Sequence, residues 1–288
     1  MLLGILLVAA MAGLFWLDYQ TQMAGIWLLP LGVVLAILAT EEILAFMGAA
    51  GLHPAPVAVY AGNLLVVTAN WFPLVFSHIR PDRAVAGVAW PLAALALAVI
   101  VVFLAEIRRY EKPGGVTGNI AAAIFVLVYV GLMLSFAIQM RISWGLGALV
   151  SMLLVVKMGD IGAYAVGRLL GRHKMSPRIS PGKTIEGGVG AMVFSCGTAW
   201  VAGVWIAGAA VPSSASGGTP WWGWLAYGLL VGAAGMVGDL SESLLKRDVG
   251  RKDSSTWLPG FGGVLDIVDS VLLAAPVAWI CWLLGLVG

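Results

Sequence analysis

The sequence predicts an all-α, polytopic integral membrane protein with about nine transmembrane helices. Only 10% of its 288 residues are charged, against about 25% in a soluble domain. A further 61% are hydrophobic, and they gather in long apolar segments. A soluble globule of this size would lack the polar surface to cover such an interior. The composition therefore excludes a soluble enzyme, a disordered chain and a nucleic-acid-binding domain.

Nine segments approach the roughly 20 apolar residues that cross a bilayer. The first is short, and because it has no basic flank or clear cleavage site, we interpret it as a membrane helix and not as a signal peptide. The sixth contains Lys157 and Asp160, and the eighth ends at Asp239. Ionisable groups at membrane depth are costly and mark functional sites. The segments are 1–17, 24–40, 55–76, 85–105, 119–138, 143–164, 187–210, 221–240 and 264–287.

Basic residues are distributed unevenly between the two sets of loops. Of the 16 Lys and Arg residues, 12 follow even-numbered segments, in the stretches 108–112, 168–183 and 246–252. The positive-inside rule places these loops, and the N-terminus, in the cytoplasm. We therefore expect a multi-pass protein of the cell (inner or plasma) membrane with its active site on the cytoplasmic side.

The two halves of the chain differ in chemical content. Residues 1–142 are expected to be generic scaffold helices, and Glu41 and Glu42 are interpreted as a solvated pair at a helix end. Residues 143–288 are expected to be the catalytic region, with cytoplasmic loops 165–186 and 241–263. This region contains eight of the 14 acidic residues: Asp160, Glu186, Asp239, Glu242, Asp248, Asp253, Asp266 and Asp269.

Two acidic patterns stand out in the C-terminal half. Asp239, Glu242, Ser243 and Lys246 have the spacing of one helical stripe. The residues Asp266 and Asp269 are three apart, so their carboxylates can converge on one cation. A glycine-rich stretch, 259–263, precedes them and would leave room for a ligand at a helix N-terminus. Oxygen ligands without a His or Cys cluster indicate Mg²⁺ with a polyphosphate, not zinc.

The stretch Ser180-Pro181-Gly182-Lys183-Thr184 resembles the end of a phosphate-binding loop. The P-loop pattern requires Gly at position 177, where this chain has Pro, so that interpretation fails. What remains is a turn whose hydroxyl and basic groups suit phosphate oxygens. A basic loop that only touches anionic lipid is an equally simple explanation, and the paired aspartates favour the catalytic one.

Together these residues resemble the phosphatidate cytidylyltransferase (CDP-diacylglycerol synthase) family. The pattern S-x-x-K-R-x4-K-D, then P-G-x-G-G-x-x-D-x-x-D, is met by Ser243, Lys246, Arg247, Lys252, Asp253, Pro259, Gly260, Gly262, Gly263, Asp266 and Asp269. The upstream run from Asp160 to Gly187 is also similar to the family. The specific match covers residues 157–270, and the first 150 residues add only membrane helices.

The resemblance implies transfer of a cytidylyl group from CTP to phosphatidate, giving CDP-diacylglycerol and pyrophosphate. It implies Mg²⁺ held by Asp239, Asp266 and Asp269, with potassium as a second cation, and a homodimer. Lys183, Lys246, Arg247 and Lys252 would neutralise phosphates beside the catalytic Asp253. Ser180, Thr184, Ser243, Gly262 and Gly263 would bind substrate. Lys157 and Asp160 would line the path for lipid or simply pair with each other.

Two departures from the family pattern leave alternatives open. Phe261 stands where the family usually has His, and Ile267 where it usually has Arg. Because the acidic residues are intact, we expect an active enzyme with a variant site. The alternatives are a CTP-dependent lipid kinase, a synthase acting on another lipid phosphate, a membrane transporter and an inactive scaffold.

Overall fold

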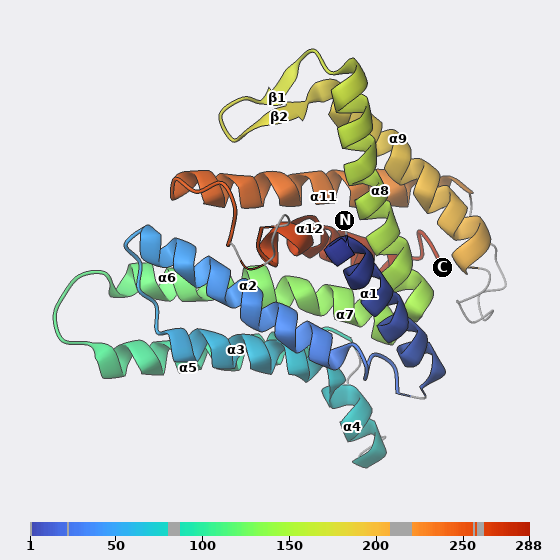
Figure 1. Ribbon diagram of the computed structural model, residues 1–288. Coiled ribbons are helices and arrows are strands. Elements are labelled where there is room, and N and C mark those ends of the chain that lie inside the picture. The colour runs from blue at the N-terminus through green and yellow to red at the C-terminus, as the bar shows by residue number, and fades with distance from the viewer. Residues whose placement is uncertain (1, 22, 80–86, 208–220, 256, 258–261) are drawn as a thin grey trace.

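The computed structural model describes residues 2–21, 23–79, 87–207, 221–255, 257 and 262–288. Pro259, Gly260 and Phe261 lie outside these residues. Within the described residues, eleven α-helices make up most of the fold (Figure 1). They are α1 (Leu2–Gln20), α2 (Leu29–Ala49), α3 (Pro56–Thr68), α4 (Phe72–Ile79), α5 (Ala89–Arg109), α6 (Val116–Val126), α7 (Met133–Trp144), α8 (Leu146–Leu170), α9 (Ile185–Val201), α11 (Trp221–Asp248) and α12 (Leu265–Leu283).

Three short helical pieces join or extend these helices. The 3-10 turn η1 (Ala69–Trp71) links α3 to α4, and the π-helical stretch η3 (Leu127–Leu132) links α6 to α7. A second π-helical stretch, η4 (Ala202–Ala207), follows α9. Because η3 continues the helix without a break, Val116–Trp144 forms one 29-residue span.

Within the described residues, eight helical segments are long and apolar enough to cross a membrane. The polytopic membrane fold is therefore confirmed, while the count of nine is not, since α1 is not among the eight. The segments are Leu29–Ala49, Pro56–Val75, Ala89–Arg109, Val116–Trp144, Leu146–Leu170, Ile185–Val204, Trp221–Asp248 and Leu265–Leu283.

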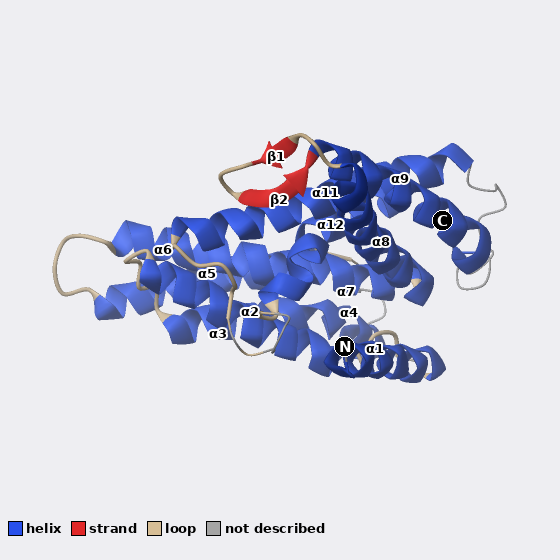
Figure 2. Ribbon diagram, turned by 45° about the horizontal axis from the view of Figure 1, so that its top comes forward, coloured by secondary structure: helices blue, strands red, loops and turns tan. Residues whose placement is uncertain are grey.

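Residues 174–184 form a hairpin outside the helices (Figure 2). Strand β1 (Lys174–Ser176) pairs antiparallel with β2 (Ser180–Thr184), with Lys174 opposite Thr184. The turn expected at 180–184 is therefore wrong in its secondary structure. A two-stranded sheet has only edge strands, which tolerate Pro181. The hairpin is held to α11 by Arg247, whose Nε donates to the Ile179 carbonyl at 3.2 Å.

The helix α12 lies at the junction of two hydrophobic clusters. Leu265 and Leu272 pack in the cluster of the N-terminal helices. On another side of the same helix, Val271 and Ala275 pack in the cluster formed with α7, α8, α9 and α11. A side chain at Gly238 of α11 would meet the α12 backbone at Asp269 and Ser270. Such close helix contact is what small residues allow in membrane proteins, and it fixes α11 against α12 at the level of the acidic residues.

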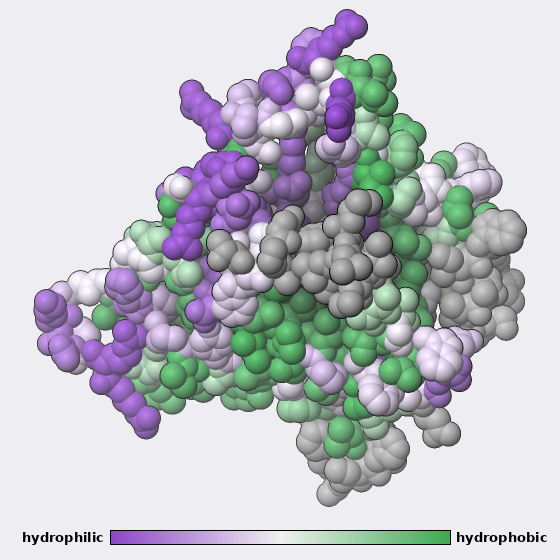
Figure 3. Space-filling model, in the orientation of Figure 1, coloured by the Kyte–Doolittle hydropathy of each residue, from purple (hydrophilic) through white to green (hydrophobic). Residues whose placement is uncertain are grey.

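Hydrophilic residues gather over the hairpin, the α5–α6 loop and the C-terminal end of α11 (Figure 3). These elements carry the three basic stretches that the sequence analysis assigns to one side of the membrane. The side itself, cytoplasmic or outer, stays a prediction.

A buried ion pair joins the N-terminal helix to the middle of the chain. Arg141 Nε donates to Asp18 Oδ2 at 2.6 Å, and the Asp18 side chain is 0% exposed. Asp18 also accepts hydrogen bonds from the Gly25 and Trp27 amides, so it fixes the α1–α2 turn.

We predict that Arg141→Met destabilises the protein by about 3–5 kcal/mol, because it leaves a buried carboxylate without its cation. Denaturant unfolding in detergent would measure the change. Arg168→Met removes an exposed cation of α8 and should change stability by less than about 0.5 kcal/mol. Equal losses in the two variants would contradict the buried-pair explanation.

Candidate active site

A cavity of about 380 Å³ lies between α8, β2, α9 and α11, within the usual size range of small-ligand pockets. Its polar lining includes Asp160, Ser180, Lys183, Thr184 and Asp239. Lys183 Nζ and Asp239 Oδ2 lie 2.8 Å apart, joining the hairpin to α11. The structure therefore brings three predicted substrate-binding residues of the hairpin to one predicted metal ligand.

Asp239 also belongs to a group of acidic side chains from three helices. Its charge acts on both Asp160 of α8 and Asp269 of α12. Ser243 Oγ donates to Asp239 Oδ1 at 3.5 Å, as their spacing on one helical stripe predicts. Asp269 is 5% exposed, and its Oδ1 accepts from the Ser270 amide and hydroxyl. Two of these carboxylates, Asp160 and Asp239, line the cavity, and their negative charge favours a cation or a cationic partner there.

Lys157 contributes a positive charge next to this group. Its Nζ lies 3.5 Å from Asp160 Oδ2 and donates to the Ile267 carbonyl at 3.0 Å. The simple pairing between Lys157 and Asp160 is thus present, and Lys157 also ties α8 to the first turn of α12.

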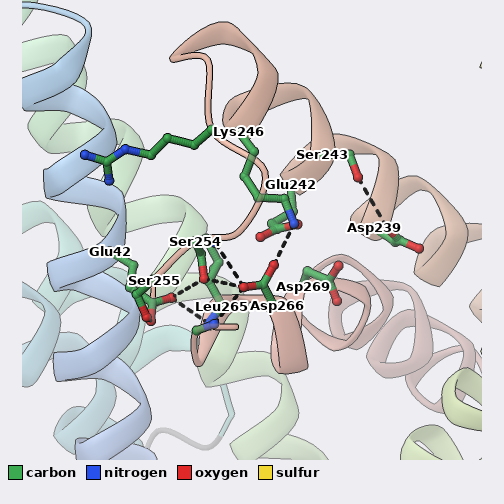
Figure 4. A network of polar contacts seen from close by, with 12 residues as sticks. Glu42, Asp239, Glu242, Ser243, Lys246, Ser254, Ser255, Leu265, Asp266 and Asp269 are labelled. Atoms are coloured by element: carbon green, nitrogen blue, oxygen red, sulfur yellow. Dashed lines mark hydrogen bonds and ion pairs between the residues drawn. The ribbon is translucent and has the colours of Figure 1, made fainter. Parts of the chain in front are cut away.

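A second network centres on Lys246 (Figure 4). Lys246 Nζ contacts Glu242 of its own helix and lies 2.6 Å from Asp266 Oδ1. Asp266 Oδ2 accepts from the Ser254 amide at 3.0 Å, the Ser254 hydroxyl at 2.6 Å and the Gly263 amide at 2.7 Å. Both oxygens of Asp266 are therefore engaged, and they hold Ser254 and Gly263 close to Lys246 of α11.

Gly262 and Gly263 are needed for close approach within this network. Gly262 has φ +81°, a left-handed conformation that favours glycine. A Cβ at Gly262 would meet the Asp266 carboxylate, and one at Gly263 would meet Ser254 and the Glu42 carboxylate. The space beside both of these predicted substrate-binding glycines is therefore occupied by protein carboxylates.

Glu42 corrects one of our sequence interpretations. It is 2% exposed and accepts four hydrogen bonds from the 254–265 segment, so it is not a solvated interfacial residue. The predicted segment ended at residue 40, whereas α2 continues to Ala49. The apolar residues after Glu42 were the available signal, because they place its carboxylate inside a membrane helix.

The remaining predicted residues lie on another side of the network. Lys252 and Asp253 line a second cavity of about 480 Å³, together with Glu41, Arg251 and Trp257. Arg247 contacts the hairpin and donates to the Arg251 carbonyl at 3.1 Å. The structure thus divides the predicted catalytic residues between two cavities, with Lys246 and Asp266 in the network that also contains Glu42.

The proposed metal ligands need a test of fit. In the part of the chain that the structure describes, no three His, Cys, Asp or Glu side chains are close enough to hold a metal ion. Mg²⁺, however, is usually bound by one or two carboxylates plus substrate phosphates and water. The oxygen donors Asp239 and Asp269 fit that chemistry, whereas Asp266 already accepts four contacts.

Comparison with known proteins shows the family to which the chain belongs. The family model described as "Cytidylyltransferase family" matches residues 2–284. The chain belongs to the cytidylyltransferase family.

Its curated relatives include the phosphatidate cytidylyltransferase of Mycobacterium bovis, 38% identical over 170 residues, which are 59% of this chain and 52% of the relative. That of Mycobacterium leprae is 32% identical over 252 residues, 84% of this chain and 75% of the relative. The enzyme of Staphylococcus saprophyticus is 36% identical over 157 residues, 54% and 56% of the two chains. The chain spans about half the length of most of these relatives.

The Lys246 network predicts a large stability difference between two lysines. Lys246 is 12% exposed and faces two carboxylates, so Lys246→Met should cost about 3–5 kcal/mol. Lys183 pairs with Asp239, whose carboxylate is more exposed than those of Glu242 and Asp266. Lys183→Met should therefore lower the free energy of unfolding clearly less than Lys246→Met. Denaturant titration of both variants in detergent would measure this, and an equal or reversed order would contradict the assignment.

Proposed function

We propose that the protein transfers a cytidylyl group from CTP to phosphatidate, releasing pyrophosphate and forming CDP-diacylglycerol. The cavity between α8, β2, α9 and α11 carries the proposal. It combines apolar lining, such as Val156, Met175 and Met236, with the polar groups of Lys183 and Asp239. A lipid phosphate requires both kinds of surface in one place. Membership of the cytidylyltransferase family and the names of its relatives support the reaction.

The reaction requires no protein nucleophile. A phosphate oxygen of phosphatidate forms a bond to the α-phosphorus of CTP, and the bond from that phosphorus to the oxygen of the β-phosphate breaks. The electron pair leaves with pyrophosphate. The chain's contribution is to hold the two anions together and to offset their charge.

The residues of the cavity suit these tasks. The ammonium of Lys183 would offset phosphate charge in this cavity. The other predicted charged groups lie elsewhere: Arg247 contacts the hairpin, and Lys252 and Asp253 line the second cavity. The hydroxyls of Ser180, Thr184 and Ser243 would orient phosphate oxygens. Thr184 Oγ1 accepts from the Gly187 amide at 3.1 Å, so its hydroxyl hydrogen stays available to donate. Lys246 would act through Glu242 and Asp266, and Asp266 in turn would keep Ser254 and Gly263 in place.

Magnesium is part of the proposal. Asp239 and Asp269 would hold Mg²⁺, whereas Asp266, the third predicted ligand, is engaged by Lys246, Ser254 and Gly263. Potassium is the second cation that the resemblance implies. When bound, Mg²⁺ would neutralise charge on the triphosphate and on the departing pyrophosphate.

We place this site on the cytoplasmic side of the cell membrane. The excess of Lys and Arg in the loops at this end of the molecule supports that side through the positive-inside rule, and CTP would reach the cavity from the cytoplasm. A homodimer is included in the proposal on the strength of the family resemblance alone.

We predict that purified protein with CTP, phosphatidate and Mg²⁺ releases pyrophosphate, and that EDTA abolishes the release. Asp269→Ala should lower the rate by at least about 100-fold, because a charge-stabilising group is lost. Asp248→Ala, which removes an exposed acid from the end of α11, serves as the matched control and should retain the wild-type rate.

Three results would overturn parts of the proposal. Wild-type protein that binds CTP without releasing pyrophosphate would show that the lipid acceptor is wrong. Absence of CTP binding would favour the scaffold or transport alternatives. An active Asp269→Ala variant would remove Asp269 from the site.

A further inference from the structure

Glu42 of α2 accepts hydrogen bonds from four residues, two on each side of the glycine-rich stretch. These residues lie more than 200 positions further along the chain. The hydroxyls of Ser254 and Ser255 donate to its carboxylate at 2.9 and 2.8 Å. The amides of Val264 and Leu265 donate to it at 2.9 and 2.8 Å. A carboxylate that is 2% exposed thus receives four donors from one segment (Figure 4).

The distribution of these donors over the two oxygens is significant. Oε1 accepts from the Ser255 hydroxyl and the Val264 amide. Oε2 accepts from the Ser254 hydroxyl and the Leu265 amide. Each oxygen therefore receives one backbone N–H. The amide nitrogen of a glutamine would face a backbone donor in either orientation, and donors cannot pair with each other.

The two amides belong to the start of α12, where helix N–H groups lack partners within the helix. A negative charge there also interacts favourably with the helix dipole. Val264, the N-cap residue of α12, has no side-chain group that could accept a hydrogen bond from these amides, and none is formed by it. The carboxylate of Glu42, which belongs to α2, accepts hydrogen bonds from these amides instead.

Through Ser254, the contacts of Glu42 continue into the site. The Ser254 hydroxyl lies 2.9 Å from Glu42 Oε2 and 2.6 Å from Asp266 Oδ2. Asp266 in turn pairs with Lys246 of α11. One turn further along α12 is Asp269, whose carboxylate interacts with the charge of Asp239. The position of α12's first turn therefore sets where both aspartates lie relative to α11.

We infer that Glu42 is a positioning residue of the active site, acting through Ser254, Ser255 and the first turn of α12. The inference rests on the proposed cytidylyl transfer and deepens it. It gives a residue of the N-terminal half a part in the chemistry, although that half contributes no other residue to the predicted site.

The test compares Glu42→Gln with Glu42→Asp and two matched controls. Glu106→Gln changes another buried carboxylate, to which the Ala55 amide and Arg109 both donate at Oε1. A glutamine can turn its carbonyl oxygen to that position and keep both. Glu111→Gln changes an exposed acid in the α5–α6 loop, away from both cavities. Full-length protein in detergent is used for all variants.

Two readouts separate positioning from general stability. The first is hydrogen exchange at the Val264 and Leu265 amides, which needs no substrate. The second is the kinetics of pyrophosphate release, with kcat, the KM for phosphatidate and the Mg²⁺ concentration at half-maximal rate. Misplacement of catalytic groups by about 1 Å can cost about 100-fold in rate, whereas a loss of folded protein would not shift a half-maximal Mg²⁺ concentration.

For Glu42→Gln we expect at least tenfold faster exchange at both amides, a kcat about 100-fold lower and a higher half-maximal Mg²⁺ concentration. The KM for phosphatidate should change less than threefold. Glu42→Asp, which keeps both oxygens, should recover part of the rate. Both controls should behave as wild type in the exchange and kinetic measurements.

Wild-type kinetics in Glu42→Gln would overturn the inference, as would a Glu106→Gln variant that is equally impaired. If wild-type protein releases no pyrophosphate, the proposed reaction fails, and exchange then decides the inference. Faster exchange in Glu42→Gln alone supports it, and unchanged exchange overturns it.

Discussion

The arrangement of the site depends on one continuous set of hydrogen bonds and ion pairs between three helices. It runs from Glu42 of α2 through Ser254 to Asp266 of α12, and from there to Lys246 and Glu242 of α11. Charged groups this poorly exposed are costly unless each has partners. The cost makes the arrangement specific, because displacing any helix would leave a buried charge without its counterpart.

Packing gives this polar set a fixed frame. The helix α12 contributes to both hydrophobic clusters, so it cannot shift toward one half of the protein without losing contacts with the other. Gly238 lets α11 approach the α12 backbone at Asp269. Since lipid offers apolar side chains no less favourable surroundings than a protein core, close fit and interior polar contacts do most of the work of holding such helices together. The acidic residues are therefore positioned by contacts between backbones as much as by their own pairs.

The hairpin completes the cavity from outside the bundle. It carries Ser180, Lys183 and Thr184 over the end of α11, and Lys183 pairs with Asp239. A helical bundle with one hairpin at its hydrophilic end suits the proposed reaction between a lipid phosphate and a soluble nucleotide. Figure 3 shows hydrophilic residues gathered over the hairpin and the C-terminal end of α11, where we propose that the two reactants meet.

The sequence by itself determined the membrane fold, the approximate positions of the spans and the residues that carry charge in the C-terminal half, because composition and spacing are local properties. It also predicted that Asp239, Ser243 and Lys246 share a helical stripe, which the 3.6-residue period of a helix dictates. Only the tertiary structure decided the partners. Three features depend on segments distant in sequence. These are whether Asp266 faces a metal ion or Lys246, whether residues 180–184 form a turn or a strand, and which groups contact Glu42. Glu42 shows the reason most clearly: its four donors come from residues 254–265, and no local pattern around position 42 encodes them.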